Sequence, residues 1–133
     1  MEQTKLYLEN YNIVNVSLSI NPSFKATNDS IEMNPLFGKK IIRIDDSHAA
    51  VILKVEIKNE GNKPFFGGIT IQGIFRCNNW ENNEDGVFLV NQTTAAILFP
   101  YLRHALSDVT SLMNIPPYIL PVVNVQALFK DSK

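Results

Sequence analysis

The feature of this sequence that most restricts its fold is a change in the spacing of apolar residues along the chain. In several early stretches apolar residues recur at every second position, whereas in residues 93–114 they recur every three or four positions. Period two is that of a β-strand with one face in a core, and a period near 3.6 is that of an amphipathic helix. Strands followed by a helix predict an α+β domain, in which helices cover one face of an antiparallel sheet.

Four stretches carry the strand pattern. The clearest contains Val51, Leu53 and Val55, which alternate with residues of the opposite face. Gly61, in the polar turn after this stretch, is the natural residue for a positive φ. Three further glycines interrupt the last stretch and predict β-bulges or the close approach of another backbone. We therefore predict strands over residues 11–20, 40–45, 49–58 and 65–77.

A long connection, residues 21–38, joins the first two predicted strands. Pro22 ends the first strand because proline fixes φ and removes a backbone donor. A connection of this length inside a compact domain is more often functional than accidental. It carries several apolar residues that look exposed, namely Phe24, Ile31, Met33, Leu36 and Phe37.

The helical period follows a polar loop, residues 78–86, and runs through residues 93–114. Proline does not fit inside a regular helix, so Pro100 predicts either a new helix beginning near Phe99 or a kink. Two prolines at 116 and 117 end the helix, and a short helical turn is predicted at residues 125–129. The predicted apolar stripe consists of Leu98, Leu102, Ala105, Val109 and Leu112.

Composition and charge exclude several classes of protein. The 133 residues form one predicted domain, residues 1–133, with a formal net charge of −1, so no basic surface favours nucleic acid. The start of the chain lacks a signal-peptide pattern, and no apolar run is long enough to span a membrane. We therefore expect a cytoplasmic protein. Only 19% of the residues are charged and asparagine is abundant, which favours a homo-oligomer.

The sequence contains no convincing catalytic or metal-binding pattern. Cys77 is the only cysteine, which excludes an internal disulfide and a cysteine-based zinc site. His48 and His104 have no second ligand at metal-binding spacing, and both are expected to face solvent. The adjacent Asp45 and Asp46 are typical of a solvated turn rather than an acid–base pair. We expect no enzymatic activity, no metal and no cofactor.

Two longer blocks resemble the SecB-type chaperone family. The first, residues 50–75, has the form of the family's β-hairpin and ends in Gly-Ile-Phe at positions 73–75. The second, residues 97–129, opens with Ile-Leu-Phe-Pro-Tyr and passes through a proline-rich stretch. It then ends in a match to Pro-Val-Asn-x-x-Ala-Leu-Phe with one extra valine. The order and spacing of both blocks match the family, and together they cover nearly half of the chain.

The resemblance implies a fold and a mechanism. SecB-like subunits resemble a twisted four-stranded antiparallel sheet with a long crossover after the first strand, a long helix and a short terminal helix. They assemble as dimers of dimers and hold unfolded polypeptide clients in apolar grooves lined by the crossover, the sheet and the C-terminal region. On this basis the expected polypeptide-binding residues are Phe24, Leu36 and Phe37 from the crossover, with Leu36 at the family's tryptophan position, and Leu128 and Phe129 from the C-terminal element.

The chain also departs from the export chaperones, which dock on the motor SecA through an acidic face of the sheet. The family's acidic positions on the first strand correspond to Asn15 and Ser19, and its leucine and glutamate on the later strand correspond to Phe66 and Gly68, so no carboxylate remains at any of them. The missing carboxylates argue against charge-complementary docking on SecA. The leading hypothesis is a holdase for unfolded chains. The alternatives are a dedicated chaperone of one client such as an antitoxin, an adaptor for a folded partner, and a small-molecule binder using the apolar cleft.

Overall fold

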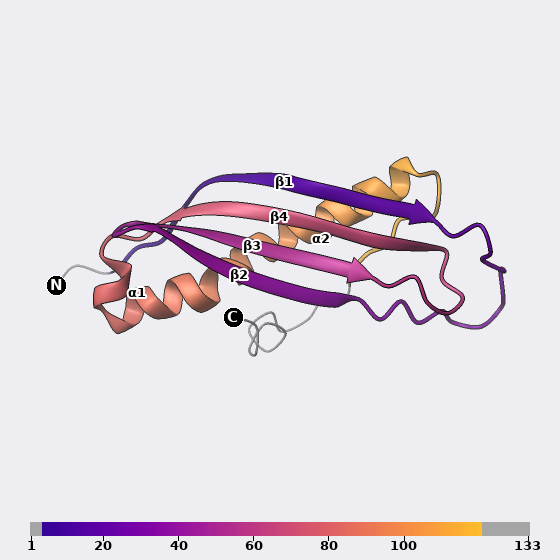
Figure 1. The fold of residues 1–133 in the computed structure, drawn as a ribbon, viewed down its shortest axis with the longest axis horizontal. Coiled ribbons are helices and arrows are strands. Elements are labelled where there is room, and N and C mark those ends of the chain that lie inside the picture. Colours follow the sequence, from indigo (N-terminus) through magenta and orange to yellow (C-terminus); the bar gives the residue numbers. More distant parts are fainter. Residues whose placement is uncertain (1–3, 121–133) are drawn as a thin grey trace.

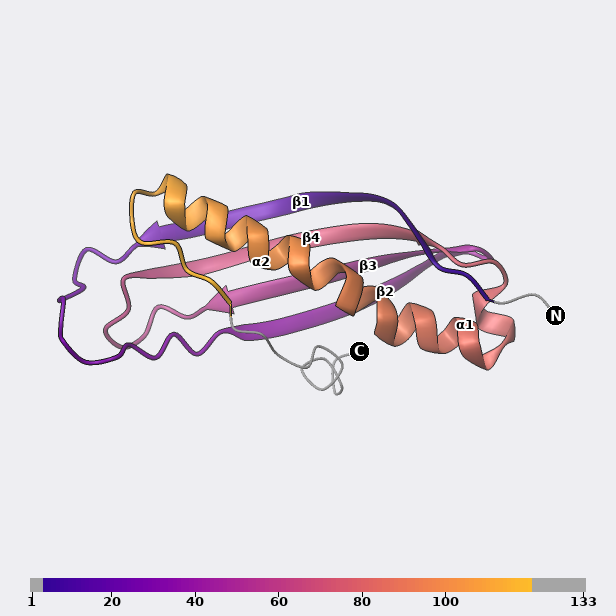
Figure 2. The ribbon, with the colours of Figure 1, turned by 180° about the vertical axis from the view of Figure 1, so that it is seen from behind.

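The computed structural model describes residues 4–120, which form a twisted four-stranded antiparallel sheet with a long helix across one face (Figure 1). The strands lie in the order β1-β4-β3-β2, so the first two strands of the chain form opposite edges. Helix α2 crosses the sheet diagonally, and the other face carries no helix (Figure 2). The elements are β1 (Tyr7–Ile20), β2 (Leu36–Asp45), β3 (His48–Ile57), β4 (Phe65–Arg76), a 3-10 turn (Trp80–Asn82), α1 (Glu84–Phe88), a π-helical turn (Leu89–Thr93) and α2 (Thr94–Leu112).

The predicted fold class is confirmed, and β3 and β4 lie close to their predicted bounds. β2 differs, because it begins at Leu36 rather than at residue 40. Leu36 pairs with Glu56 and Phe37 with Val55, so both residues belong to the sheet and not to the crossover. The crossover is therefore residues 21–35, which connects the two edge strands around one end of the sheet (Figure 1). The predicted helical turn at residues 125–129 lies outside the described residues.

β1 is longer than predicted because two bulges interrupt its alternation. Its register against β4 shifts between Leu8 and Asn10 and again between Ile13 and Asn15. Each bulge adds one residue, Glu9 or Val14, and resets the period of two. The stretch from Tyr7 to Asn10 therefore does not continue the pattern of residues 15–20, although it belongs to the same strand.

The core lies between α2 and the two central strands. Every second side chain of β3 and β4 faces the helix, and most of these are at most 2% exposed, including Leu53 and Ile71. Gly73 lets the helix approach, because a Cβ at this position would lie 2.8 Å from Leu98 Cδ2. Gly67 has φ 124° and passes so close to β1 that a Cβ would collide with the Ser17 carbonyl. The predicted close approach at the glycines is confirmed, whereas the bulges lie on β1.

Helical structure begins at Glu84, inside the polar loop that the sequence predicts over residues 78–86. Asn83 caps α1 by accepting a hydrogen bond from Gly86 N at 2.6 Å, and two acidic residues follow in the first turn. Helical structure then continues to Leu112 through the π-helical turn. Pro100 lies inside α2 on its exposed side, so no new helix begins near Phe99.

The buried stripe of α2 shares Leu98 and Leu102 with the predicted one but then follows a different line along the helix, through Leu106. Leu98, Leu102 and Leu106 are at most 1% exposed, each one turn after the last. Leu112, predicted in the stripe, is 86% exposed and points away from the core, whereas its neighbour Met113 packs against the core cluster.

Lys39 anchors the junction between α1 and α2. It lies on the helix-facing side of β2, paired with Leu53, and only 8% of it is exposed. Its Nζ donates a hydrogen bond of 2.6 Å to the carbonyl of Asn91, which belongs to the π-helical turn. Desolvation by the surrounding core lowers the pKa of the ammonium group. The same helical segment covers a small second core that contains Cys77, Trp80 and Val90.

Replacing Lys39 with methionine is expected to loosen this junction. A hydrogen bond from a charged donor is worth roughly 1.5–3 kcal/mol, so its loss lets the segment open about ten times more often. The rate at which a small thiol reagent modifies Cys77, the only cysteine and 1% exposed, reports that opening. Lys40→Met, which changes the neighbouring exposed lysine on the opposite face, is the control. Equal labelling rates in the two variants would contradict the anchoring role of Lys39.

A group of ion pairs joins strands at the end of the sheet near α1. His48 at the start of β3 lies between two carboxylates, with Nδ1 2.8 Å from Asp45 Oδ1 and Nε2 3.2 Å from Glu9 Oε1. The bond to Asp45, with its charge and that of Glu9, raises the pKa of His48. The bond from His48 and that from the Ser47 backbone lower the pKa of Asp45. Glu9, the bulged residue of β1, is thereby connected to β3.

Stability is expected to decrease as the pH rises through the raised pKa of His48. The stabilisation is complete below the ordinary pKa of histidine, about 6.5, and is lost as the folded-state imidazolium releases its proton. His48→Gln should therefore show a smaller fall in urea-unfolding midpoint between about pH 6 and 9 than the original chain. Asp45→Asn should likewise show a smaller fall in urea-unfolding midpoint over this pH range. An unchanged dependence in both variants would show that the group does not couple to folding.

Candidate functional site

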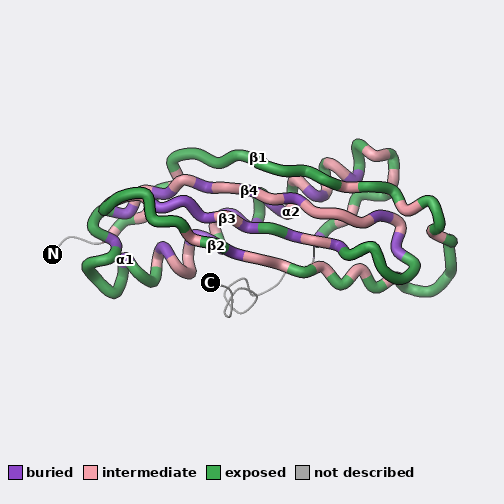
Figure 3. Tube along the Cα trace, viewed as in Figure 1, coloured by how far each residue is buried: buried purple, intermediate pink, exposed green. Residues whose placement is uncertain are grey.

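Most residues of β1 are exposed (Figure 3), including several on the side of the strand that faces the helix. Side chains that pair directly across an antiparallel ladder share a face. Tyr11 pairs with Gly73 and Val16 with Ile69, whose side of β4 is buried under α2, yet both β1 residues are well exposed. We call this set the β1 stripe: Tyr11 (40% exposed), Ile13 (39%), Val16 (46%) and Ile20 (50%).

Helix α2 contributes an aromatic ring to the border of the β1 stripe. The ring of Tyr101 lies 4.3 Å from that of Tyr11, and 38% of Tyr101 is exposed. The β1 stripe and Tyr101 are not among the binding residues predicted from the sequence. Alternation along β1 indicates only that one face of the strand is apolar. How much of that face one helix covers depends on where the helix crosses the sheet.

A second apolar region lies toward the β2 edge of the same face, where Phe37 meets α2. Its half-buried ring lies 5.8 Å from that of Phe99, and Met33 of the crossover packs against the same core cluster. Phe24 is also half-buried, in the turn after β1, where its backbone N–H donates to the Asn21 carbonyl at 3.2 Å. The Asn21 side chain in turn donates to the carbonyl of Lys63 at 2.8 Å, which fastens the crossover to the β3–β4 turn.

Leu36, by contrast, does not share a face with Phe37. Its partner Glu56 lies on the side of the sheet that carries no helix, and Leu36 is 46% exposed there. The two neighbouring residues expected in one groove therefore point to opposite faces, as alternation along a strand requires. Leu128 and Phe129 lie outside the described residues, so the structure gives no position for them.

The chain that follows α2 returns to the helix-facing core. Asn114, with φ 62°, ends the helix, and Tyr118 N then donates to Thr110 Oγ1 at 2.9 Å. The Tyr118 ring packs edge-on against Phe65 with 5.7 Å between ring centroids, and burial raises the pKa of its hydroxyl. Ile119 is 61% exposed and Leu120 is buried. The crossover, β2 and this returning segment thus all contact one core cluster. We call this area, with Phe24, Met33, Phe37 and Tyr118, the crossover region.

The opposite face of the sheet is mostly polar along β1 and β4. The positions at which SecB-type exporters carry their motor-docking acids lie together there: Asn15 is beside Thr70, and Ser19 beside Phe66. Gly68 faces the same side, paired with Ser17. Amide and hydroxyl groups stand at Asn15 and Ser19, and Phe66 and Gly68 stand where the resemblance predicts a leucine and a glutamate.

The titratable residues considered as catalytic candidates have ordinary surroundings. Cys77 is buried, and desolvation raises the pKa of its thiol, which disfavours the reactive thiolate. His104 faces solvent and pairs with Asp108 at 3.0 Å on its own helix. Within residues 4–120, no three histidine, cysteine or acidic side chains are grouped so as to hold a metal ion. In the same range, no helix combines the length and apolarity needed to cross a bilayer.

Known proteins match this chain over nearly its whole length. The family model "Preprotein translocase subunit SecB" matches residues 2–133. The protein-export protein SecB of Acinetobacter baylyi is 33% identical over 104 residues, which are 76% of this chain and 68% of the relative. The SecB of Psychrobacter cryohalolentis is 26% identical over 136 residues, covering 98% of this chain and 89% of the relative.

Solved structures show the same fold. The SecB-like chaperone Rv1957 of Mycobacterium tuberculosis, in complex with a ChAD peptide from the antitoxin Rv1956 HigA1, superposes with a TM-score of 0.69 at 12% identity. That similarity covers 89% of this chain and 90% of the solved one. Together with the sheet order, the crossover and the sequence matches, these comparisons establish the family. The chain belongs to the SecB family.

Proposed function

We propose that this protein is a chaperone that holds unfolded or non-native polypeptides on the helix-facing side of its sheet. The observation that carries the proposal is the half-buried apolar surface of the crossover region, where three separate segments meet the core and Ile119 beside them is exposed. SecB proteins are a family of chaperones rather than of enzymes, which supports the proposal. A holding function requires apolar surface and no reacting group, in agreement with the residues found there.

Client binding on such a surface is driven by removing apolar groups from water. Each Å² of apolar surface removed contributes about 25 cal/mol before the cost of ordering the client is subtracted. Apolar contact is not directional, so extended segments of many sequences fit. The ring of Phe37 supplies a rigid contact beside Phe99, and Ile119 adds exposed aliphatic surface. Leu128 and Phe129 remain proposed contacts from the C-terminal element.

The proposal includes self-association through the β1 stripe. β1 is an edge strand, and an exposed apolar edge is a ready site for pairing with another chain. Four exposed apolar side chains on one side of that edge favour a stable contact with a second copy. A dimer of dimers, as the family resemblance implies, is the assembly we propose.

The proposed location is the cytoplasm, and the proposed clients include chains destined for export, as the names of the relatives indicate. Docking on SecA is not part of the proposal, because Asn15, Ser19 and Gly68 provide no charge on the polar face. That observation favours a second candidate, a dedicated chaperone of one client. The two differ in client range and share the same binding surface.

Phe37→Ala is expected to weaken the ability of the protein to suppress aggregation of a chemically unfolded test protein on dilution. Loss of an aromatic contact worth about 1–2 kcal/mol raises the chaperone concentration needed for half suppression roughly five-fold to thirty-fold. Leu36→Ala, one residue away on the opposite face, should leave suppression unchanged. Light scattering during dilution is the measurement.

Because Phe37 also packs against the core, the unfolding free energy of each variant is measured in parallel. Phe24→Ala, in the crossover, provides an independent variant of the same surface. Equal loss in the Leu36 and Phe37 variants would place client binding elsewhere. No suppression by the folded original chain would exclude general holding and favour one specific partner.

Val16→Asp is expected to dissociate the assembly. A carboxylate in an apolar contact loses hydration without gaining a partner, so the dissociation constant should rise at least about tenfold. Sedimentation velocity over a range of concentrations measures the effect. Ser17→Asp adds the same charge one residue later on the polar face and should leave the assembly unchanged. Dissociation by Ser17→Asp alone would instead assign the contact to the polar face.

A further inference from the structure

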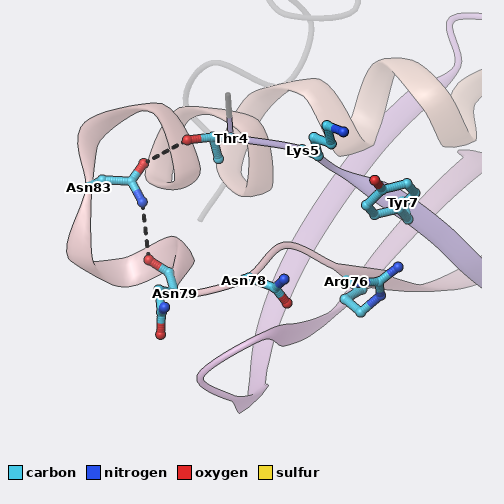
Figure 4. Close-up of a pocket in the computed structure, with 7 residues that line it drawn as sticks. All are labelled: Thr4, Lys5, Tyr7, Arg76, Asn78, Asn79 and Asn83. Atoms are coloured by element: carbon cyan, nitrogen blue, oxygen red, sulfur yellow. Dashed lines mark hydrogen bonds between the residues drawn. The ribbon is translucent and has the colours of Figure 1, made fainter. Parts of the chain in front are cut away.

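A polar hollow lies at the end of the sheet near α1, away from the crossover region. It has a volume of about 510 Å³ and lies between the segment that enters β1 and the segment that leaves β4 (Figure 4). Pockets that bind small molecules commonly have volumes of this order. Among residues 4–120, the seven that line it are all polar, and none is acidic: Thr4, Lys5, Tyr7, Arg76, Asn78, Asn79 and Asn83.

Two of the lining side chains are cations, and they are held differently. Arg76 Nε donates to Glu9 Oε2 at 3.2 Å, and the guanidinium centre lies 4.4 Å from the centroid of the Tyr7 ring. The carboxylate and the ring fix the orientation of the guanidinium while its two terminal nitrogens remain available in the described part of the chain. Lys5 is exposed and has no ion-pair partner among residues 4–120.

The neutral lining is also partly ordered in advance. Asn83 accepts from Gly86 N at 2.6 Å and donates to the Asn79 carbonyl at 3.2 Å, which fixes the turn that carries Asn78 and Asn79. Asn79 has φ 54°, a left-handed conformation that asparagine tolerates well. Figure 4 shows the side chain of Asn78 between this turn and Arg76. The side chains of Asn78 and Tyr7 have no hydrogen-bond partner within residues 4–120.

We propose that this hollow binds a small oxyanion, a phosphate or carboxylate group carried by a compact polar molecule. An oriented guanidinium and a free ammonium match two oxygens of such a group, and amide and hydroxyl groups match a polar body. The acid that contacts Arg76, Glu9, also pairs with His48 and is not among the lining residues of the hollow. The hollow shares no lining residue with the client surface, so anion binding there does not depend on the proposed chaperone function.

The test is titration of the isotopically labelled full chain with inorganic phosphate and, separately, with succinate, at low ionic strength. Saturable shifts of the backbone amides at residues 76–79 are expected, with a dissociation constant on the order of 1 mM, typical of an exposed site with few contacts. Tighter phosphate binding identifies a phosphate ligand, and tighter succinate binding identifies a carboxylate ligand. Chloride at matched ionic strength shows what screening alone produces.

Lys5→Gln removes one cation from the hollow and is expected to weaken binding about five-fold. Lys40→Gln removes the same charge from β2, which does not line the hollow, and should leave the dissociation constant unchanged. Aggregation suppression measured on the same variants separates this site from the client surface and should be unaffected. Shifts that do not saturate, shifts that chloride reproduces, or equal weakening in the two variants would overturn the proposal.

Discussion

The structure depends on the packing of one helix against the two central strands of a four-stranded sheet. Leu98, Leu102 and Leu106 form the buried ridge of α2, and Gly73 of β4 allows that ridge to approach the sheet. A helix with its side chains is about 10 Å wide, whereas four strands spaced about 4.8 Å apart extend over roughly 14 Å between the outer axes. One helix therefore covers the middle of this sheet and leaves apolar positions exposed at its edges.

The two edge strands, β2 and β1, differ in how far other parts of the chain cover them. At β2, Lys39 and Phe37 turn toward the helix, and the crossover and the segment through Tyr118 add contacts, so that edge is half-buried. At β1 the side chains of the β1 stripe stay well exposed, with one contact between Tyr101 and Tyr11, while Leu8 and Leu18 pack against the core. The first edge thus suits reversible contact with a passing client, and the second suits a lasting contact with another copy.

Much of this arrangement could be predicted from the sequence, because no bulge shifts the register between β3 and β4 and their apolar residues keep the period of two. The start of β2 could not, since Pro35 and Gly38 resemble a loop until pairing with β3 places Leu36 and Phe37 in a ladder. The start of the helix was missed although Asn83 followed by two acids is a capping signal. The β1 stripe could not be predicted at all, because exposure there depends on the path of α2 and not on local pattern.

The face of the sheet without a helix is polar along β1, and this affects how the protein can associate. If both faces of the sheet bound other chains, the assembly could grow without limit, so one face must not bind them. On β1 this face presents asparagine and serine, including Asn15, Ser17 and Ser19, which stay hydrated without a net charge. Hydration of these positions disfavours association through the β1 half of this face, whereas Leu36 and Ile42 of β2 expose apolar surface on the same side. The absence of charge along these β1 positions also means that a partner docking there is selected by shape and hydrogen bonds rather than by long-range attraction.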